Sequence, residues 1–260
     1  MSLLSVQAML IPATILFASA SITHVYNEDF GKRQKEGLQK NHVQSISGWT
    51  FVYNNGTPVK NGVKTSIERF DLNGNRTEDV FFNEKGETFS EFTYTYNPDG
   101  IELKSIGMVR HKPVYNFWSY NYNDSTGIME KYHAKQKLNK EKWVYKFDKE
   151  GNKLEELYYD TEGYQVSRKV FKYDEQQRLS EKIEFDAYDN LFEKWVYAYD
   201  AKGNNTKQVQ YNSDSEIIRQ YQLVYDEKGN LTTRITSNAK GVTETMTVFL
   251  YEFYPSTEGK

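Results

Sequence analysis

The sequence contains no cysteine among its 260 residues. Disulfide bonds, thiolate metal sites, cysteine nucleophiles and lipid attachment to a cysteine are therefore excluded. An excess of basic charge is also missing, because 33 Lys and Arg stand against 36 Asp and Glu. Proteins that bind nucleic acid usually carry a strongly basic domain, so we expect no nucleic-acid partner.

Long hydrophobic runs are absent as well. The run from Leu10 to Ala18 is short, whereas a membrane-spanning helix needs about 20 apolar residues. It is followed by Ala18-Ser19-Ala20, the small-x-small pattern read by signal peptidase. We therefore expect residues 1–20 to be a signal peptide, the mature chain to have no transmembrane span, and the protein to be exported to the periplasm or cell surface. A buried first strand or helix is the alternative, because no Lys or Arg precedes the run.

The rest of the chain divides by composition. Residues 21–44 are polar with mixed charges, which predicts a linker with room for one turn of helix. Residues 45–254 are expected to form one β-repeat domain, and residues 255–260 a flexible tail.

Aromatic residues are abundant, with 15 Phe, 4 Trp and 21 Tyr. An aromatic residue followed by Asp or Asn recurs at alternating steps of 12 and 14 residues, as at Tyr173, Phe185, Tyr199 and Tyr211. The true period is therefore 26 residues with two similar halves. It covers about residues 66–254.

Each half ends in an Asx-x-x-Gly unit, such as Asp200–Gly203. An Asp side chain can accept hydrogen bonds from the backbone ahead of it, and Gly tolerates the positive φ that closes a hairpin. Gln177, Asp189 and Ser215 replace the glycine in three units. Turn chemistry explains these Asp residues better than calcium loops do, and the four histidines are isolated. We expect no metal and no cofactor.

The segments between turns alternate in polarity, as β-strands do. The register predicts that aromatics such as Trp195 and aliphatics such as Ile183 share one face, opposite a charged face. Strands joined by short loops pair antiparallel. The predicted fold is all-β: an antiparallel β-meander of 26-residue two-strand repeats, coiled or rolled into a single sheet of about 15 or more strands.

The segment from Tyr225 to Leu231, YDEKGNL, resembles the YD repeat of RHS-like proteins, and Tyr199–Asn204 and Phe147–Leu154 are near matches. The regular alternation also resembles that of short exported repeat proteins found in Bacteroidota. The resemblance spans nearly three quarters of the chain. It implies a coiled or rolled antiparallel sheet and says little about activity.

The repeat degenerates over residues 103–146, where Arg110–Pro113 interrupts a strand and aromatic residues are dense. Local departures from a pattern often accompany function. A bulge or longer loop with buried aromatics is the alternative interpretation. The candidate contacts for a partner or glycan are Arg110, His111, Tyr115, Phe117, Trp118, Tyr132 and Trp143.

No catalytic motif is present, so we expect a non-enzymatic scaffold or interaction protein of the cell envelope. Its partner would be another envelope protein or an outer-membrane complex, and the chain could be an accessory periplasmic subunit of a secretion or transport machine. The alternative is a glycan-binding module that requires at least two of Trp118, Trp143 and Trp195 to be exposed and nearly coplanar. A third hypothesis, a hydrolase, requires two facing acids in a cleft.

Overall fold

The computed structural model describes residues 28–59, 61–98, 102–122, 126–132 and 140–255. The predicted signal peptide and most of the predicted tail lie outside these residues. The described elements are α1 (Glu28–Lys40), β1 (Val43–Asn54), β2 (Thr57–Pro58), β3 (Val63–Phe70), β4 (Arg76–Phe82), β5 (Thr88–Tyr96), β6 (Glu102–Val109), β7 (Lys112–Tyr122), β8 (Thr126–Tyr132), β9 (Lys140–Phe147), β10 (Lys153–Tyr159), β11 (Gln165–Tyr173), β12 (Leu179–Asp186), β13 (Leu191–Tyr199), β14 (Asn205–Tyr211), β15 (Ile217–Tyr225), β16 (Leu231–Asn238) and β17 (Thr243–Phe253).

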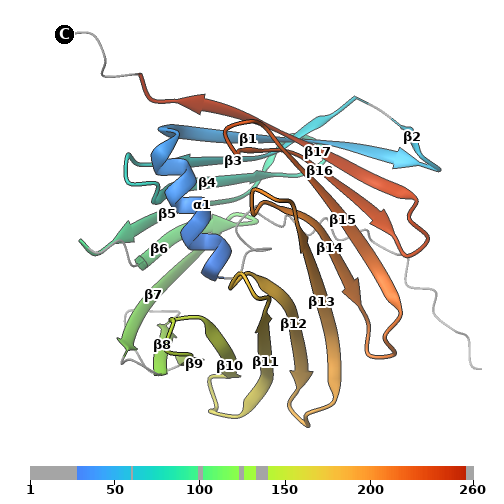
Figure 1. Ribbon diagram of the computed structural model, residues 1–260. Helices are drawn as coiled ribbons and strands as arrows, with labels where there is room; N and C mark the ends of the chain where they lie inside the picture. Colours follow the sequence, from blue (N-terminus) through green and yellow to red (C-terminus); the bar gives the residue numbers. More distant parts are fainter. Residues whose placement is uncertain (1–27, 60, 99–101, 123–125, 133–139, 256–260) are drawn as a thin grey trace, which may run out of the picture.

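The strands form one antiparallel sheet that closes on itself (Figure 1). Each strand from β3 to β17 pairs with the next, and β1 pairs with both β3 and β17. The short β2 pairs with β1 alone, so the ring contains 16 of the 17 strands. The all-β antiparallel prediction is confirmed. The coiled or rolled open sheet is wrong, because nine register pairs from Val43↔Phe253 to Val52↔Thr245 join its two edge strands into a barrel.

The predicted turns are present, and the hydrogen bonds show why they recur. In the turn after β13, Asp200 Oδ1 accepts bonds from the backbone N–H groups of Lys202 and Asn204, both at 2.9 Å. Asp200 Oδ2 accepts a third bond, also 2.9 Å, from the side-chain amide of Asn204. Gly203 follows with a φ of 85°. The Asp200 carboxylate thus stabilises the turn through these hydrogen bonds, as expected from the sequence.

The two faces of the sheet do not divide as the sequence register predicts. Tyr197 and Gln208 are register partners, and so are Ala198 and Lys207, but Tyr199 pairs with Asn205, so Thr206 is skipped as a bulge. One extra residue reverses the side-chain alternation. The aromatics of β13 therefore point into the barrel, whereas the aliphatics expected beside them point outward from the neighbouring strands, as Ile183 does between the outward Val170 and Lys194.

One end of the barrel is covered by α1, and we call it the helix end; the opposite end is the mouth (Figure 1). Residues 21–44 were expected to be a linker with room for one turn of helix, but Glu28–Lys40 forms 13 residues of helix. Leu38 explains this, because it is buried in the cluster described below. No described helix is long and apolar enough to cross a membrane.

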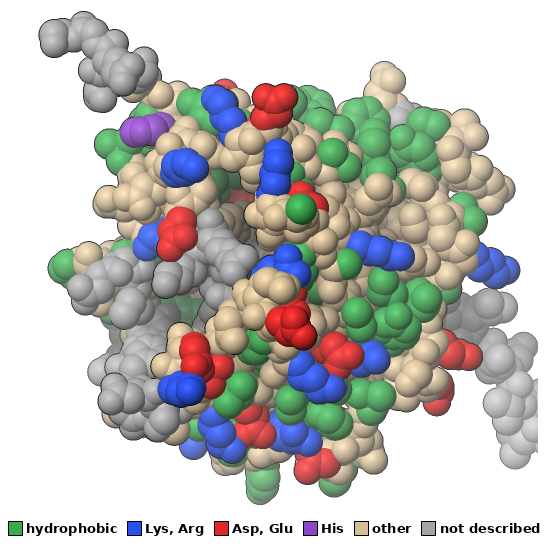
Figure 2. Space-filling view, viewed as in Figure 1, with side chains coloured by type: hydrophobic (Ala, Val, Ile, Leu, Met, Phe, Trp, Pro, Cys, Tyr) green, Lys and Arg blue, Asp and Glu red, His purple; other side chains and the backbone are tan. Residues whose placement is uncertain are grey.

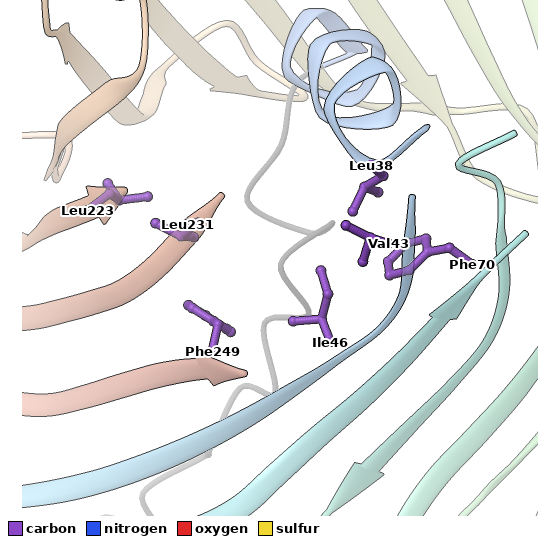
Figure 3. Close-up of a cluster of buried hydrophobic side chains, with 7 residues drawn as sticks. All are labelled: Leu38, Val43, Ile46, Phe70, Leu223, Leu231 and Phe249. Atoms are coloured by element: carbon purple, nitrogen blue, oxygen red, sulfur yellow. The ribbon is translucent and has the colours of Figure 1, made fainter. Parts of the chain in front are cut away.

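The larger of two buried apolar clusters among the described residues lies beneath α1 (Figure 3). Gly74, in the turn after β3, approaches the helix so closely that an added Cβ would lie 2.5 Å from the Lys35 carbonyl oxygen. The Asn41 side-chain amide donates to Asn230 Oδ1 at 2.8 Å and so ties the end of the helix to the turn before β16. The cluster consists of Leu38, Val43, Ile46, Phe70, Leu223, Leu231 and Phe249.

Candidate functional site

The structure divides the predicted contact residues among a turn and two faces of the sheet. Arg110 and His111 form the two-residue turn between β6 and β7 at the mouth, with φ values of 48° and 64°. This is the backbone of a tight hairpin whose two central residues are both left-handed. The predicted interruption of a strand is thus a turn, after which the strand resumes at Lys112.

Two of the predicted residues, Tyr115 and Phe117, lie on the outer face of β7. Tyr115 is the register partner of Ile106, and Met108 is the partner of Pro113. Tyr115 and Met108 expose 45% and 43% of their surface. We call these five outward residues of β6 and β7 the wall patch. Tyr132 is the register partner of Phe117 on β8, but its side chain lies outside the described part of the structure.

Basic side chains border the wall patch. The Lys104 ammonium lies 5.8 Å from the Phe117 ring centroid. Exposed Arg110 lies 5.0 Å from the ring of Phe89 on the neighbouring β5. Glu91 also lies on this surface, as the register partner of Met108. The patch is therefore apolar at its centre, with Lys104, Arg110 and Glu91 along its border.

The other two predicted residues, Trp118 and Trp143, point into the barrel and lie together. Their ring centroids are 6.1 Å apart at an interplanar angle of 51°. Trp143 also stacks on Tyr158, with centroids 4.9 Å apart and an angle of 25°. The indole N–H of Trp118 donates to Glu102 Oε1 at 2.8 Å, and the Tyr158 hydroxyl donates to Glu141 Oε1 at 2.8 Å. The hydrogen-bond donors of Trp118 and Tyr158 are thus paired with carboxylates inside the barrel.

The glycan-binding alternative fails the conditions set for it. Trp118, Trp143 and Trp195 all face the interior of the closed sheet, and none is among the exposed hydrophobic residues. Trp118 and Trp143 are tilted rather than coplanar. Trp195 stacks on Tyr221, with ring centroids 5.6 Å apart, so Tyr221 already covers one face of the Trp195 ring.

Charged side chains of β10 to β12 form a paired network on the inward face. The Lys153 ammonium lies 3.0 Å from Glu156 Oε2, and the Lys169 ammonium lies 3.2 Å from Glu156 Oε1 and 3.8 Å from Glu184. Burial opposes ionisation of Glu156, but Lys153 and Lys169 outweigh it and lower the pKa of that carboxyl. Glu156 is therefore an ionised carboxylate held between two ammonium groups.

Two facing acids, Glu68 and Asp79, do occur on the inward face of β3 and β4, where they are register partners. They are 1% and 2% exposed, too little for contact with a substrate. Arg76 lies 2.9 Å from Asp79 Oδ2, and the Tyr94 hydroxyl donates to the same oxygen at 2.6 Å. Burial raises the pKa of Tyr94, so it remains a neutral donor. This geometry is that of a buried ion pair rather than a hydrolytic centre.

No three His, Asp or Glu side chains gather as metal ligands within the described ranges. What sequence reasoning missed is the mouth. Its turns expose aromatic side chains at Tyr164 and Tyr188, which are 73% and 87% exposed, and the strand after the second turn exposes Phe192 at 63%. A signal was available, since these residues sit in or beside the Asx turns, where a side chain cannot enter a sheet core.

Comparisons with known proteins give distant likenesses. No protein-family model matches the sequence, and no curated protein matches it. A porin-like protein from Bacteroides uniformis is 8% identical over 81% of this chain and 98% of its own, with a TM-score of 0.35. A DUF1329 family protein from Desulfovibrio piger is 9% identical over 88% of this chain and 92% of its own, with a TM-score of 0.33. A second porin-like protein, from Bacteroides vulgatus, is 10% identical over 82% of this chain and 99% of its own, with a TM-score of 0.32.

Likenesses at these TM-scores carry no argument about function. The resemblance to YD-repeat, RHS-like proteins is wrong. No family model matches the chain, and the sheet closes through β1 and β17 into a barrel instead of continuing as an open repeat. The local Tyr-Asp-turn pattern is explained by the Asx turns themselves, which any antiparallel hairpin can use.

Proposed function

We propose that this protein is a non-enzymatic scaffold of the cell envelope that docks a partner protein through the wall patch. The single observation that carries the proposal is the exposure of contiguous apolar residues on β6 and β7, where the repeat departs from its own pattern. Exposed apolar patches rimmed by polar residues mark protein interaction sites.

The interior supports a structural role rather than catalysis. Inward acids such as Glu156 and Asp79 are paired with Lys or Arg, and indole and phenol groups donate to the carboxylates of Glu102 and Glu141. An active site would need a titratable group that can reach a substrate. The inward groups described above are instead used in holding neighbouring strands together.

The charges on the outer face of the barrel favour a protein whose outer surface is in contact with water. Ion pairs cross its outer face, with Lys172 2.8 Å from Glu181 and Arg168 3.8 Å from Glu155. Figure 2 shows Lys, Arg, Asp and Glu distributed over one side of the molecule among apolar side chains. A lipid-facing strand carries an apolar band about 25 Å tall, which these charges would interrupt. Exposure of the wall patch is therefore best explained by a protein partner.

The proposed location in the envelope is supported by the predicted signal peptide at residues 1–20. An exported chain of this kind would meet a periplasmic or outer-membrane partner, and an accessory role in a secretion or transport complex fits a rigid barrel with one docking side. The closed ring leaves few free strand edges, so side chains rather than strand addition would provide the contact.

The test is co-purification of the tagged protein from envelope extracts of the native host. We expect the wild type to retain a partner and the Met108→Ser/Tyr115→Ser variant to lose it, because both apolar contacts are removed. The matched control is Ile218→Ser/Val224→Ser on the outer face of β15, where the two side chains are 43% and 42% exposed.

The control variant should retain the partner at the wild-type level. A wild-type protein that is always recovered alone would contradict the proposal. Equal loss of the partner in both variants would contradict the assignment to the wall patch.

A further inference from the structure

The mouth carries an uneven distribution of charge. Three successive mouth turns, after β10, β12 and β14, each contain two acids and no Lys or Arg. The nearest ion pair joins Arg168 to Asp189 at 2.9 Å and neutralises one of the six. This acidic arc consists of Asp160, Glu162, Asp186, Asp189, Asp214 and Glu216.

Exposed aromatic side chains accompany the acids. Tyr164 and Tyr188 lie in the first two of these turns, and Phe192 follows the second; all three are more than 60% exposed. Aromatic residues are enriched at protein interfaces because they bury a large area at low entropic cost. Their rings also attract Lys and Arg. The arc is therefore suited to a basic surface.

A basic pole occupies another part of the same mouth. Arg110 and Lys112, at the turn from β6 to β7, are exposed, with His111 between them. Six strands, β7 to β12, separate this turn from the middle turn of the acidic arc. The mouth thus has an acidic arc and a basic pole on a ring of 16 strands, and the turn between β4 and β5, next to the basic pole, carries Glu84, Lys85 and Glu87.

We propose that the partner at the mouth is a second copy of this chain, joined mouth to mouth by a twofold axis. A twofold axis in the plane of the mouth, midway between the poles, places the basic pole of each copy on the acidic arc of the other. The contact is isologous, so it closes at two copies and forms no open chain. Charge complementarity occurs twice, and the exposed rings meet Arg110 and Lys112.

The dimer would be a capsule formed by two barrels, each covered at its outer end by α1. This inference does not rest on the wall patch, which faces sideways and stays available to another protein. A basic protein or peptide is the competing occupant of the acidic arc, and the experiment separates the two by using the purified chain alone.

The test is the solution mass of the purified mature chain, measured by light scattering and sedimentation. We expect a dimer that dissociates in about 1 M salt, where charges are screened beyond about 3 Å. The Arg110→Asp/Lys112→Glu variant and the Glu162→Lys/Asp214→Lys variant should each raise the dimer dissociation constant about tenfold or more, because each places like charges in contact. Asp is chosen at 110 because it tolerates the left-handed backbone found there.

Mixing the two variants in equal amounts should restore the dimer, since the acids introduced at positions 110 and 112 then face the bases introduced at positions 162 and 214. The matched control, Lys149→Glu/Lys202→Glu, changes the net charge as the first variant does but at helix-end turns, and should dimerise as the wild type does. A wild type that is monomeric at every concentration would overturn the proposal. So would a dimer that is insensitive to charge reversal, or variants that remain folded by circular dichroism but fail to pair when mixed.

Discussion

The helix end and the mouth are built from the same Asx turn but differ in what covers them. At the helix end, α1 seals an apolar cluster in which Leu38, Val43 and Ile46 are at most 7% exposed. At the mouth, Tyr188 is 87% exposed, and acidic and basic turns are separated around the rim. The repeat thus sets the turns at both ends. Helix α1 buries an apolar cluster at one end, whereas the side chains at the mouth stay exposed to a binding partner.

The largest expected difference between the ends is in stability. Leu231→Ala removes a buried side chain from the helix-end cluster and should lower the free energy of unfolding by about 2–5 kcal/mol. Phe192→Ala at the mouth should change it by no more than about 0.5 kcal/mol. Urea denaturation of the two variants checks this. Similar costs at the two ends would show that α1 does not create a distinct core.

The Asx turns should behave alike at both ends, which sharpens the comparison. Hydrogen bonds from Asn204 lower the pKa of Asp200 at the helix end, and those from Asn190 lower the pKa of Asp186 at the mouth. A lowered folded-state pKa gives stability that is present above the unfolded pKa of about 3.9 and lost as the pH falls through the folded pKa.

Asp200→Asn and Asp186→Asn keep an oxygen acceptor in the turn but remove the titration, as Asn212 does naturally in the same position. Each variant should therefore lose part of the decline in stability below about pH 4. Thermal unfolding from pH 2 to pH 7 measures the effect. A variant whose pH profile matches the wild type would rule out the turn carboxylate as a source of acid sensitivity.

A smaller effect should come from tyrosines that reach back to the first residue of the preceding strand. The Tyr199 hydroxyl donates to the Leu179 carbonyl at 2.7 Å, 20 residues earlier, and Tyr173 and Tyr251 make the equivalent bond. Tyr199→Phe should cost about 1 kcal/mol. Tyr164→Phe, at the exposed mouth, is the control and should be neutral. A neutral result for both variants would mean that the bond between the Tyr199 hydroxyl and the Leu179 carbonyl contributes nothing to the free energy of unfolding.

The smallest effect concerns the backbone of a mouth turn. Ser215 has a φ of 63° where most turns have glycine. Ser215→Gly should be neutral or stabilise by up to about 1 kcal/mol, because glycine adopts this conformation without a Cβ clash. Gly203→Ser, with a φ of 85° at the helix end, should destabilise by a similar amount. The two substitutions are compared by chemical denaturation, and effects of the same sign would contradict the turn assignment.

The sequence was informative where the determinant is local. The Asx-x-x-Gly units predicted the turns because one side chain and one glycine fix each of them, as at Asp200 and Gly203. The face assignment failed because a single bulge residue such as Thr206 reverses the alternation and leaves no mark in composition. Closure was missed because the β1–β17 pairing joins residues about 200 positions apart, which no periodicity reports.

The candidate site was predicted in part for the same reason. The break in the repeat located the Arg110–His111 turn and the exposed Tyr115. It could not separate outward Phe117 from inward Trp118, because adjacent strand residues always face opposite sides and only the closed barrel defines which side is inside. Helix α1 was missed because its segment is mostly polar, and Leu38 is its residue in the buried cluster among the side chains that the structure describes.

The closure of the sheet through its first and last strands is tested most directly by a disulfide. Ser47 on β1 and Leu250 on β17 are register partners, and the chain has no other cysteine to compete. Ser47→Cys/Leu250→Cys should form an intramolecular disulfide under mild oxidation, seen as complete loss of free thiol in a monomer-mass band, since cross-strand neighbours lie within disulfide reach. Thiols that stay free, or that cross-link only between molecules, would contradict the closed barrel.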